Sequence, residues 1–276
     1  MKESKFQPFQ RRILPLLFIA AAFTQPLATQ ARYSPQFLQN SFAPWSSQTT
    51  SSGQNYVNDI RRDGLFSWTE DHFPLKVCIQ PGYGVPGYRD SFAQIIANSF
   101  DQWVAASDGK LSWQQVDSPQ EADIVVSWIN SPTERSEGTE IGKTRTYTRY
   151  NPTTGIGTIM RADMRLLTRL PERELTDMEI KKAYLHEVGH AFGIAGHSQN
   201  PNDIMYYTVS SNHGPTLSQR DVGTLQALYE HNHRLTASTR SRSGMPQALE
   251  NRPLSRSSVL EESGARIVEQ AGSHND

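Results

Sequence analysis

The chain has 276 residues, which is enough for one substantial domain with tails or for two small domains. Its charge is balanced, with 27 Lys and Arg against 28 Asp and Glu, and it contains no glycine-rich phosphate loop and no basic aromatic stripe. The composition therefore gives no support to nucleic-acid binding. Cys78 is the single cysteine, so no internal disulfide forms and stability has to come from core packing and bound metal.

The N-terminus has the order of regions found in a secretory signal peptide. A basic start, MKESKFQPFQRR, precedes the short apolar run ILPLLFIAAAF, and small residues follow in TQPLATQA. We expect residues 1–31 to be a signal peptide that is cleaved after Ala31. The apolar run is shorter than the roughly 20 residues that a membrane-spanning helix needs, and a signal anchor is the alternative interpretation. The protein is then secreted or periplasmic, and the sequence does not distinguish the two.

The rest of the chain divides by composition. Residues 32–64 are rich in Ser, Gln, Thr and Asn, which predicts a flexible N-terminal segment or a short pro-segment. Residues 235–276 have a similar composition and are predicted to be a disordered C-terminal tail, with a marginal helix near 258–271 as the alternative. The folded domain is expected over 65–234.

Within this domain, hydrophobic periodicity predicts strands and helices in a mixed order. The segment 91–109 has apolar residues at helical spacing and ends in Gly109, so it is predicted to be a helix. A turn-forming stretch at 151–155 indicates a hairpin between two later strands. The predicted strands are 73–81, 111–117, 122–130, 141–148 and 157–167. The predicted fold class is α+β.

Two further helices have recognisable starts. Thr176 followed by Glu179 forms a capping box, which predicts a helix that begins ten residues before His186. Ser218 followed by Asp221 has the same spacing and predicts the start of the last helix.

The stretch HEVGHAFGIAGHS, residues 186–198, carries the chemistry. His186 and His190 lie four residues apart, so on a helix their imidazoles project from one face and can bind a single zinc ion. Glu187 follows the first histidine and is placed to hold a water molecule and take its proton. This pattern predicts one catalytic Zn²⁺.

The third ligand is less direct. Gly193 can end the helix in a left-handed conformation, so that a following histidine returns to the metal. The longer zinc-protease signature has this histidine at the position of Gly196, whereas here His197 comes one residue later. We predict that His197 is the third ligand and that the extra glycine absorbs the shift.

The motif and the run NPNDIMY at 200–206 resemble the metzincin zinc proteases, and within them the matrixins, the matrix-metalloproteinase family, in a bacterial exported type. The segment 122–125 is similar to the family's central strand, and 217–229 is similar to its last helix. The resemblance covers about 70–232. It implies a twisted, mixed five-stranded sheet with two helices, a small lower subdomain with a third helix, and Met205 beneath the zinc.

The resemblance also implies an activity. Matrixins are endopeptidases, so Glu187 would act as the general base, and an extended protein or peptide substrate would add to the edge strand near 141–148. We expect a monomer. Two alternatives stay open: a catalytically silent zinc protein that only binds peptides, and a zinc hydrolase that acts on cell-wall amides.

Several positions depart from the family. Between residues 73 and 185 there is no histidine to bind a structural zinc, calcium has no specific residues to support it, and no cysteine switch precedes the domain. Only one aspartate of the family's pair in the last helix is retained, Asp221, which we expect to brace the Met-turn. Tyr207 stands where matrixins usually have proline; it is a candidate transition-state donor, with a wall of the specificity pocket as the alternative. Substrate preference is not predicted.

Overall fold

The computed structural model describes residues 54–60, 65–131, 139–151, 156–209, 214–242, 257–263 and 266–267. The expected signal peptide lies outside these residues, as does most of the expected hairpin turn at 151–155. No helix in the described part of the chain is both long enough and apolar enough to span a bilayer.

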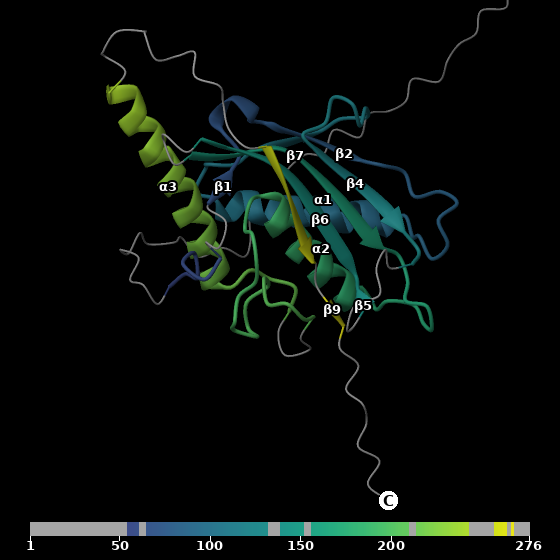
Figure 1. The fold of residues 1–276 in the computed structure, drawn as a ribbon. Coiled ribbons are helices and arrows are strands. Elements are labelled where there is room, and N and C mark those ends of the chain that lie inside the picture. Colours follow the sequence, from purple (N-terminus) through teal and green to yellow (C-terminus); the bar gives the residue numbers. More distant parts are fainter. Residues whose placement is uncertain are drawn as a thin grey trace, which may run out of the picture. The chain divides into compact units, whose positions relative to one another are not determined.

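Seven of the described strands form one sheet (Figure 1), in the order β3-β2-β4-β7-β6-β8, with β1 paired to β7. Strands β2, β3, β4 and β7 are parallel, and β6 is antiparallel to β7, so the expected mixed sheet of five central strands is confirmed. A separate ladder joins β5 and β9. The strands are β1 Phe66–Ser67, β2 Leu75–Ile79, β3 Trp113–Gln115, β4 Ile124–Ile129, β5 Thr139–Glu140, β6 Gly142–Asn151, β7 Ile156–Leu167, β8 Ser257–Ser263 and β9 Arg266–Ile267.

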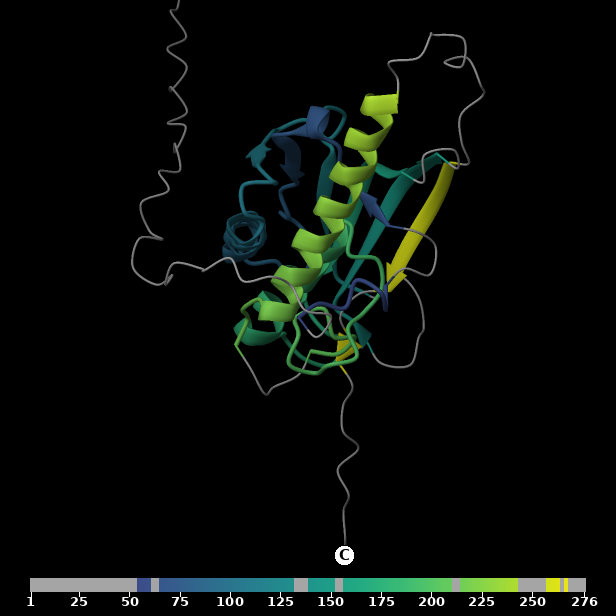
Figure 2. The ribbon, with the colours of Figure 1, turned by 90° about the vertical axis from the view of Figure 1, so that its left-hand side faces the viewer.

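One face of the sheet is covered by two helices (Figure 2). Burial alternates along β7, as expected for a strand with one face on the core and the other toward solvent. Helix α1 (Ser91–Ala106) packs on helix α2 (Asp177–Ala191) beside the buried face. Aromatic rings fill the contact: the ring centroids of Phe92 and Tyr184 lie 5.9 Å apart, and those of Phe100 and Phe192 lie 5.7 Å apart. This packing holds α2, and with it the zinc motif, against the sheet.

Both predicted capping boxes are present. The Thr176 hydroxyl accepts from the Glu179 amide, and the Glu179 carboxylate accepts from the Thr176 amide, so α2 begins as predicted. Helix α3 (Gln219–Arg242) begins with the same exchange between Ser218 and Asp221. It runs past residue 234, the expected end of the domain, to Arg242.

The N-terminal segment was expected to be flexible up to residue 64, and part of it is folded. Tyr56 is 1% exposed and Ile60 is 5% exposed, so both belong to the core. The Tyr56 hydroxyl donates to the Asp221 carboxylate on α3 at 2.6 Å. The polar average composition of 54–60 hides these two apolar side chains, whose partners lie far along the chain.

The predicted disordered tail contains two strands. β8 pairs with β6 in an antiparallel ladder, and β9 pairs with β5. The alternative of a helix near 258–271 is also wrong over these strands. Composition misled the prediction here because a strand added at a sheet edge is held by backbone hydrogen bonds rather than by side-chain burial. The edge expected near 141–148 is consequently covered by the chain itself.

Candidate active site

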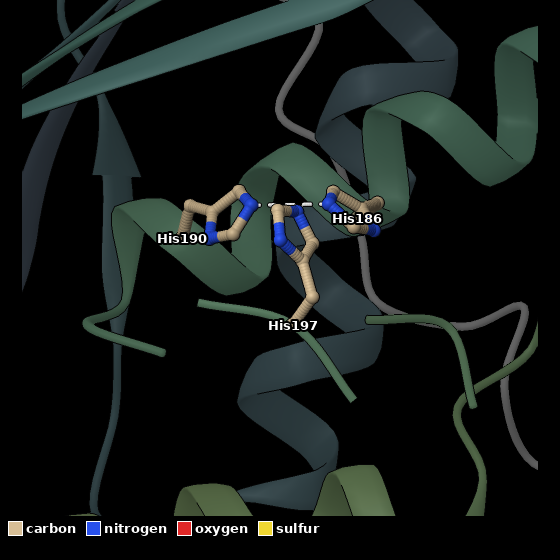
Figure 3. Close-up of side chains that lie close together, drawn as sticks. All are labelled: His186, His190 and His197. Carbon is tan, nitrogen blue, oxygen red and sulfur yellow. Dashed lines mark hydrogen bonds between the residues drawn. The ribbon is translucent and has the colours of Figure 1, made fainter. Parts of the chain in front are cut away.

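Three histidines converge at the C-terminal end of α2 (Figure 3). His186 and His190 extend from the helix, and His197 approaches from the loop that follows it. One ligand atom from each lies within 4.8 Å of the others. Three nitrogens at zinc–nitrogen distances of about 2.05 Å in tetrahedral geometry would be about 3.3 Å apart, which lies within the range that the cluster spans.

Backbone carbonyls fix the orientation of the two helical imidazoles. Nδ1 of His186 lies 2.8 Å from the Ile204 carbonyl oxygen, and Nδ1 of His190 lies 2.7 Å from that of Ile194. A carbonyl only accepts, so each Nδ1 carries the proton and each Nε2 of a neutral ring presents a lone pair. The two Nε2 atoms nevertheless lie only 3.0 Å apart, which brings two acceptors together. A cation between them resolves this arrangement, so the residues fit zinc.

Burial keeps these rings neutral. Desolvation lowers the pKa of His186 to about 3, with a further lowering by the nearby His197. Desolvation also lowers the pKa of His190 well below its usual range, and His186 and His197 add to the effect. Neutral imidazole is the form that binds a metal, so the protein environment favours ligation over protonation.

Two glycines shape the turn that brings His197 back. Gly193 has φ 102° and Gly196 has φ 92°, a conformation that residues with a side chain rarely adopt. A Cβ atom at Gly193 would also collide with the Phe66 carbonyl oxygen, whereas at Gly196 its nearest neighbour, Ile60, would be 3.6 Å away. Gly196 is thus needed for its backbone angle rather than for space. The extra residue in the motif is absorbed there, as the sequence predicted.

Glu187 is fully buried beside the histidines, at 0% exposed. The Thr144 hydroxyl on β6 donates to its Oε2 atom at 2.6 Å. Gly142, two residues earlier on β6, passes so close that an added Cβ would lie 2.5 Å from the Glu187 Cγ atom. The carboxylate is therefore held against the edge strand, and no side chain fits at Gly142.

Met205 forms the floor expected of the Met-turn. Its side chain is fully buried, and a Cβ added at Gly189, between the two helical histidines, would collide with its sulfur. Trp103 of α1 closes the same contact and donates from Nε1 to the Leu185 carbonyl oxygen at 2.8 Å. The methionine thus packs directly on the zinc helix.

Asp221 holds the Met-turn in place. Its carboxylate accepts from the backbone amide of Ile204 at 2.8 Å, from that of Met205 at 3.4 Å and from the Tyr56 hydroxyl at 2.6 Å. Burial raises the pKa of Asp221, although these hydrogen bonds oppose the rise. The expectation that Asp221 braces the Met-turn is confirmed, and a tyrosine from the N-terminal segment adds to it.

A second carboxylate fastens the loop between His197 and Met205. Asp203 is 2% exposed and accepts from the hydroxyls of Ser198 and Ser218, and it pairs with Arg220 at 3.0 Å. The Ser198 amide donates to the Met205 carbonyl oxygen at 2.9 Å. Arg220 occupies the position of the aspartate missing from the family's pair, and it serves this loop instead.

Tyr207 lies at the rim of this loop. It is 44% exposed, and its ring centroid is 4.5 Å from that of Tyr206. The role of its hydroxyl group therefore stays a prediction.

Cys78 is a buried free thiol whose pKa is raised by burial and by Asp117, which fits the interpretation as an inert core residue.

Three residues that shape the site were not found from the sequence. Thr144 and Gly142 lie in the strand predicted at 141–148, and the pattern of this strand does not indicate a contact with Glu187. Tyr56 lies in a polar stretch. The apolar pair Tyr56 and Ile60, four residues apart, is the signal that could have found the N-terminal contact. Nothing in the local pattern indicated that Thr144 would bind the carboxylate of Glu187.

The convergent imidazoles, the buried carboxylate and the mixed sheet define a metal-dependent peptidase class. The sequence model of the matrixin family matches residues 68–230, more than half of the chain. The chain belongs to the matrixin family and is a metalloendopeptidase with a zinc-binding histidine triad. A search of the curated proteins found no match.

Proposed function

We propose that this matrixin is an exported endopeptidase that cleaves extended peptides along β6, with Glu187 as general base and His186, His190 and His197 as the ligands of one zinc ion. The observation that carries the proposal is the buried Glu187 carboxylate, oriented by Thr144 next to the three convergent imidazoles. A protein that only binds peptides has no need of a base at that position.

Each residue has a separate task in this mechanism. Bound zinc supplies Lewis acidity, which polarises a peptide carbonyl and lowers the pKa of water toward about 7. Glu187 takes a proton from the attacking water and passes it to the leaving amine. Thr144 donates to Oε2 of Glu187 and so orients the carboxylate for this transfer. The backbone of Gly142 lies against the Glu187 side chain and limits where the carboxylate can move.

The substrate backbone is proposed to pair with β6, as an added strand does at other sheet edges. Tyr207 is proposed to donate its hydroxyl to the oxyanion, and its half-exposed position leaves its ring room to move. Substitution Tyr207→Phe tests this role. A loss of about tenfold or more in kcat with KM unchanged supports a donor, because one removed oxyanion donor costs about 10²–10³ at full strength. A change confined to KM identifies a pocket wall.

The main test compares the chain from residue 32 onward with its Glu187→Ala variant. Zinc content is measured by metal analysis, and cleavage of a mixed peptide library is followed by mass spectrometry. We expect one zinc in both proteins and cleavage by the parent alone. Zinc in both without cleavage by either supports the silent peptide-binding protein. Cleavage restricted to cell-wall fragments supports the amide hydrolase.

Export is part of the proposal. The N-terminal sequence of protein recovered from the periplasm or the medium of an expressing bacterium is expected to begin at Arg32, after removal of residues 1–31. An intact N-terminus on membrane-bound protein would instead support the signal anchor.

A further inference from the structure

The outer edge of β6 carries a strand from the C-terminal part of the chain. β8 pairs with β6 from Arg149 opposite Ser257 to Lys143 opposite Ser263. Figure 1 shows β8 in yellow alongside β6, and Figure 2 shows it at the margin of the sheet. The edge proposed to receive peptide substrates therefore already holds a peptide, supplied by the protein itself.

The pairing continues past the end of β8. Lys143 lies opposite Ser263, and Glu140 lies opposite Arg266. Glu140 precedes Lys143 by three residues, and Arg266 follows Ser263 by three residues. The two ladders therefore share one register, in which β8 pairs with β6 and β9 pairs with β5.

The covered stretch includes the part of the edge that touches the base. Thr144, which binds the Glu187 carboxylate, lies opposite Glu262 in the ladder. Gly142, which passes against Glu187, lies between the two ladders. The C-terminal segment thus flanks, on both sides, the point where β6 meets the catalytic carboxylate.

Three of the pairs in the register join residue types that favour each other across antiparallel strands. Arg145 lies opposite Glu261, and Glu140 lies opposite Arg266, so two pairs unite opposite charges. Tyr147 lies opposite Val259, an aromatic residue facing a β-branched one. Such pairs each contribute about 0.2–1 kcal/mol in antiparallel sheets. This complementarity selects this segment over an arbitrary extended peptide.

We propose that the C-terminal strands β8 and β9 are an intramolecular ligand of the substrate edge and compete with peptide substrates for β6. This proposal rests on the proposed function, because it assigns the edge of β6 to substrates. The tether gives the segment a local concentration in the millimolar range, so a weak ladder suffices to keep the edge filled. A substrate then binds the edge only when the segment has left it. This competition raises the apparent KM and leaves the catalytic groups unchanged.

The first test does not depend on activity. Amide hydrogen exchange is measured on Glu187→Ala protein, with the full C-terminus and with a stop after residue 256. We expect alternate amides of β6, those that face β8, to exchange at least tenfold faster in the shortened protein, because they lose their acceptors, whereas the amides of α2 keep their protection. Equal exchange of β6 in the two proteins would overturn the proposal, whether or not the protein is a peptidase.

The second test is kinetic and uses the active protein with its full C-terminus. The variant carries both Val259→Pro and Leu260→Pro. Successive amides of a strand point to opposite sides, so one of these two amides points toward β6, and its hydrogen bond to β6 is lost. We expect KM for a library-derived peptide to fall about tenfold with kcat unchanged. A protein with residues 257–267 in scrambled order controls for length and charge, and is expected to behave like the double variant.

Addition of the synthetic peptide 255–269 to the double variant completes the test. We expect competitive inhibition, with a scrambled peptide at least tenfold weaker. An unchanged KM in the double variant, or inhibition that does not compete with substrate, would overturn the proposal. Absence of all cleavage alongside faster exchange of β6 would instead refute the proposed function and leave the edge contact standing.

Discussion

The two sides of the site are built by different means. The loop between His197 and Met205 is held by buried carboxylates, Asp203 and Asp221, which bind groups from distant parts of the chain. The edge strand β6 is held on its outer side by a backbone ladder with β8. Side-chain contacts of the first kind specify one partner each, whereas a backbone ladder of the second kind can also be formed by another extended segment, such as a substrate peptide. The metal side is fixed, and the substrate side is exchangeable.

Removal of the Asp221 carboxylate is expected to have the largest effect on stability, because this carboxylate holds the metal side of the site. The variant Asp221→Ala leaves the Tyr56 hydroxyl and two backbone amides of the Met-turn buried without their acceptor. We expect the free energy of unfolding to fall by about 3 kcal/mol, measured by urea denaturation of the zinc-loaded protein. Asp177→Ala, at an exposed carboxylate, is the control and should cost less than about 1 kcal/mol. Equal losses in both variants would contradict the bracing role.

The two sides meet at Gly142, and an added methyl group there tests the junction. In Gly142→Ala the Cβ atom would lie 2.5 Å from the Glu187 Cγ atom, so the carboxylate has to move. We expect kcat/KM to fall about 100-fold with zinc content unchanged, since a small misplacement of a catalytic group has this size of effect. Gly214→Ala is the matched control, because a Cβ atom added at Gly214 would meet no atom within 4 Å. Full activity in Gly142→Ala would show that β6 does not position the base.

A smaller effect is expected from the N-terminal contact. Tyr56→Phe removes the hydrogen bond to Asp221 and keeps the buried ring. We expect a loss of about 1.5 kcal/mol in the free energy of unfolding, because the bond involves a charged acceptor. Tyr83→Phe, at a residue that is 81% exposed, should change stability negligibly. If both variants match the parent, segment 54–60 contributes nothing to the fixed side.

The smallest expected effect is pH-dependent and concerns the start of α2. Burial would raise the pKa of Glu179, but hydrogen bonds from Arg173 and Thr176 outweigh it and lower the pKa below 4.5. Its charge therefore stabilises the folded state above pH 4.5, and this contribution is lost as the pH falls through the folded-state pKa.

The variant Glu179→Gln isolates this charge, because glutamine still accepts in a capping box. We expect thermal denaturation to show a loss of about 0.5 kcal/mol at pH 7, which disappears as the pH falls through the folded-state pKa of Glu179. A difference from the parent that stays constant across this range would assign the effect to packing.

The sequence predicted the parts of the molecule that depend on local spacing. The zinc helix, its capping box at Thr176 and the shifted His197 follow from intervals of a few residues, and all three are present. The packing of Tyr56 on Asp221 joins residues 165 positions apart, and no local pattern encodes such a pair. The ladder of β8 on β6 was missed for a related reason. Its residues are too polar to be read as a buried strand, and its hydrogen bonds come from the backbone, which every sequence has.

The central claim is that Gly196 moves the third ligand by one residue and that His197 still completes the site. X-ray absorption at the zinc edge, which counts coordinated imidazoles, tests it directly on the parent and on His197→Ala. We predict three imidazoles in the parent, two in the variant and a zinc affinity lower by at least 100-fold in the variant, since a lost ligand outweighs the 10–100-fold cost of a lost outer partner. Two imidazoles in both proteins, with equal affinity, would contradict the account.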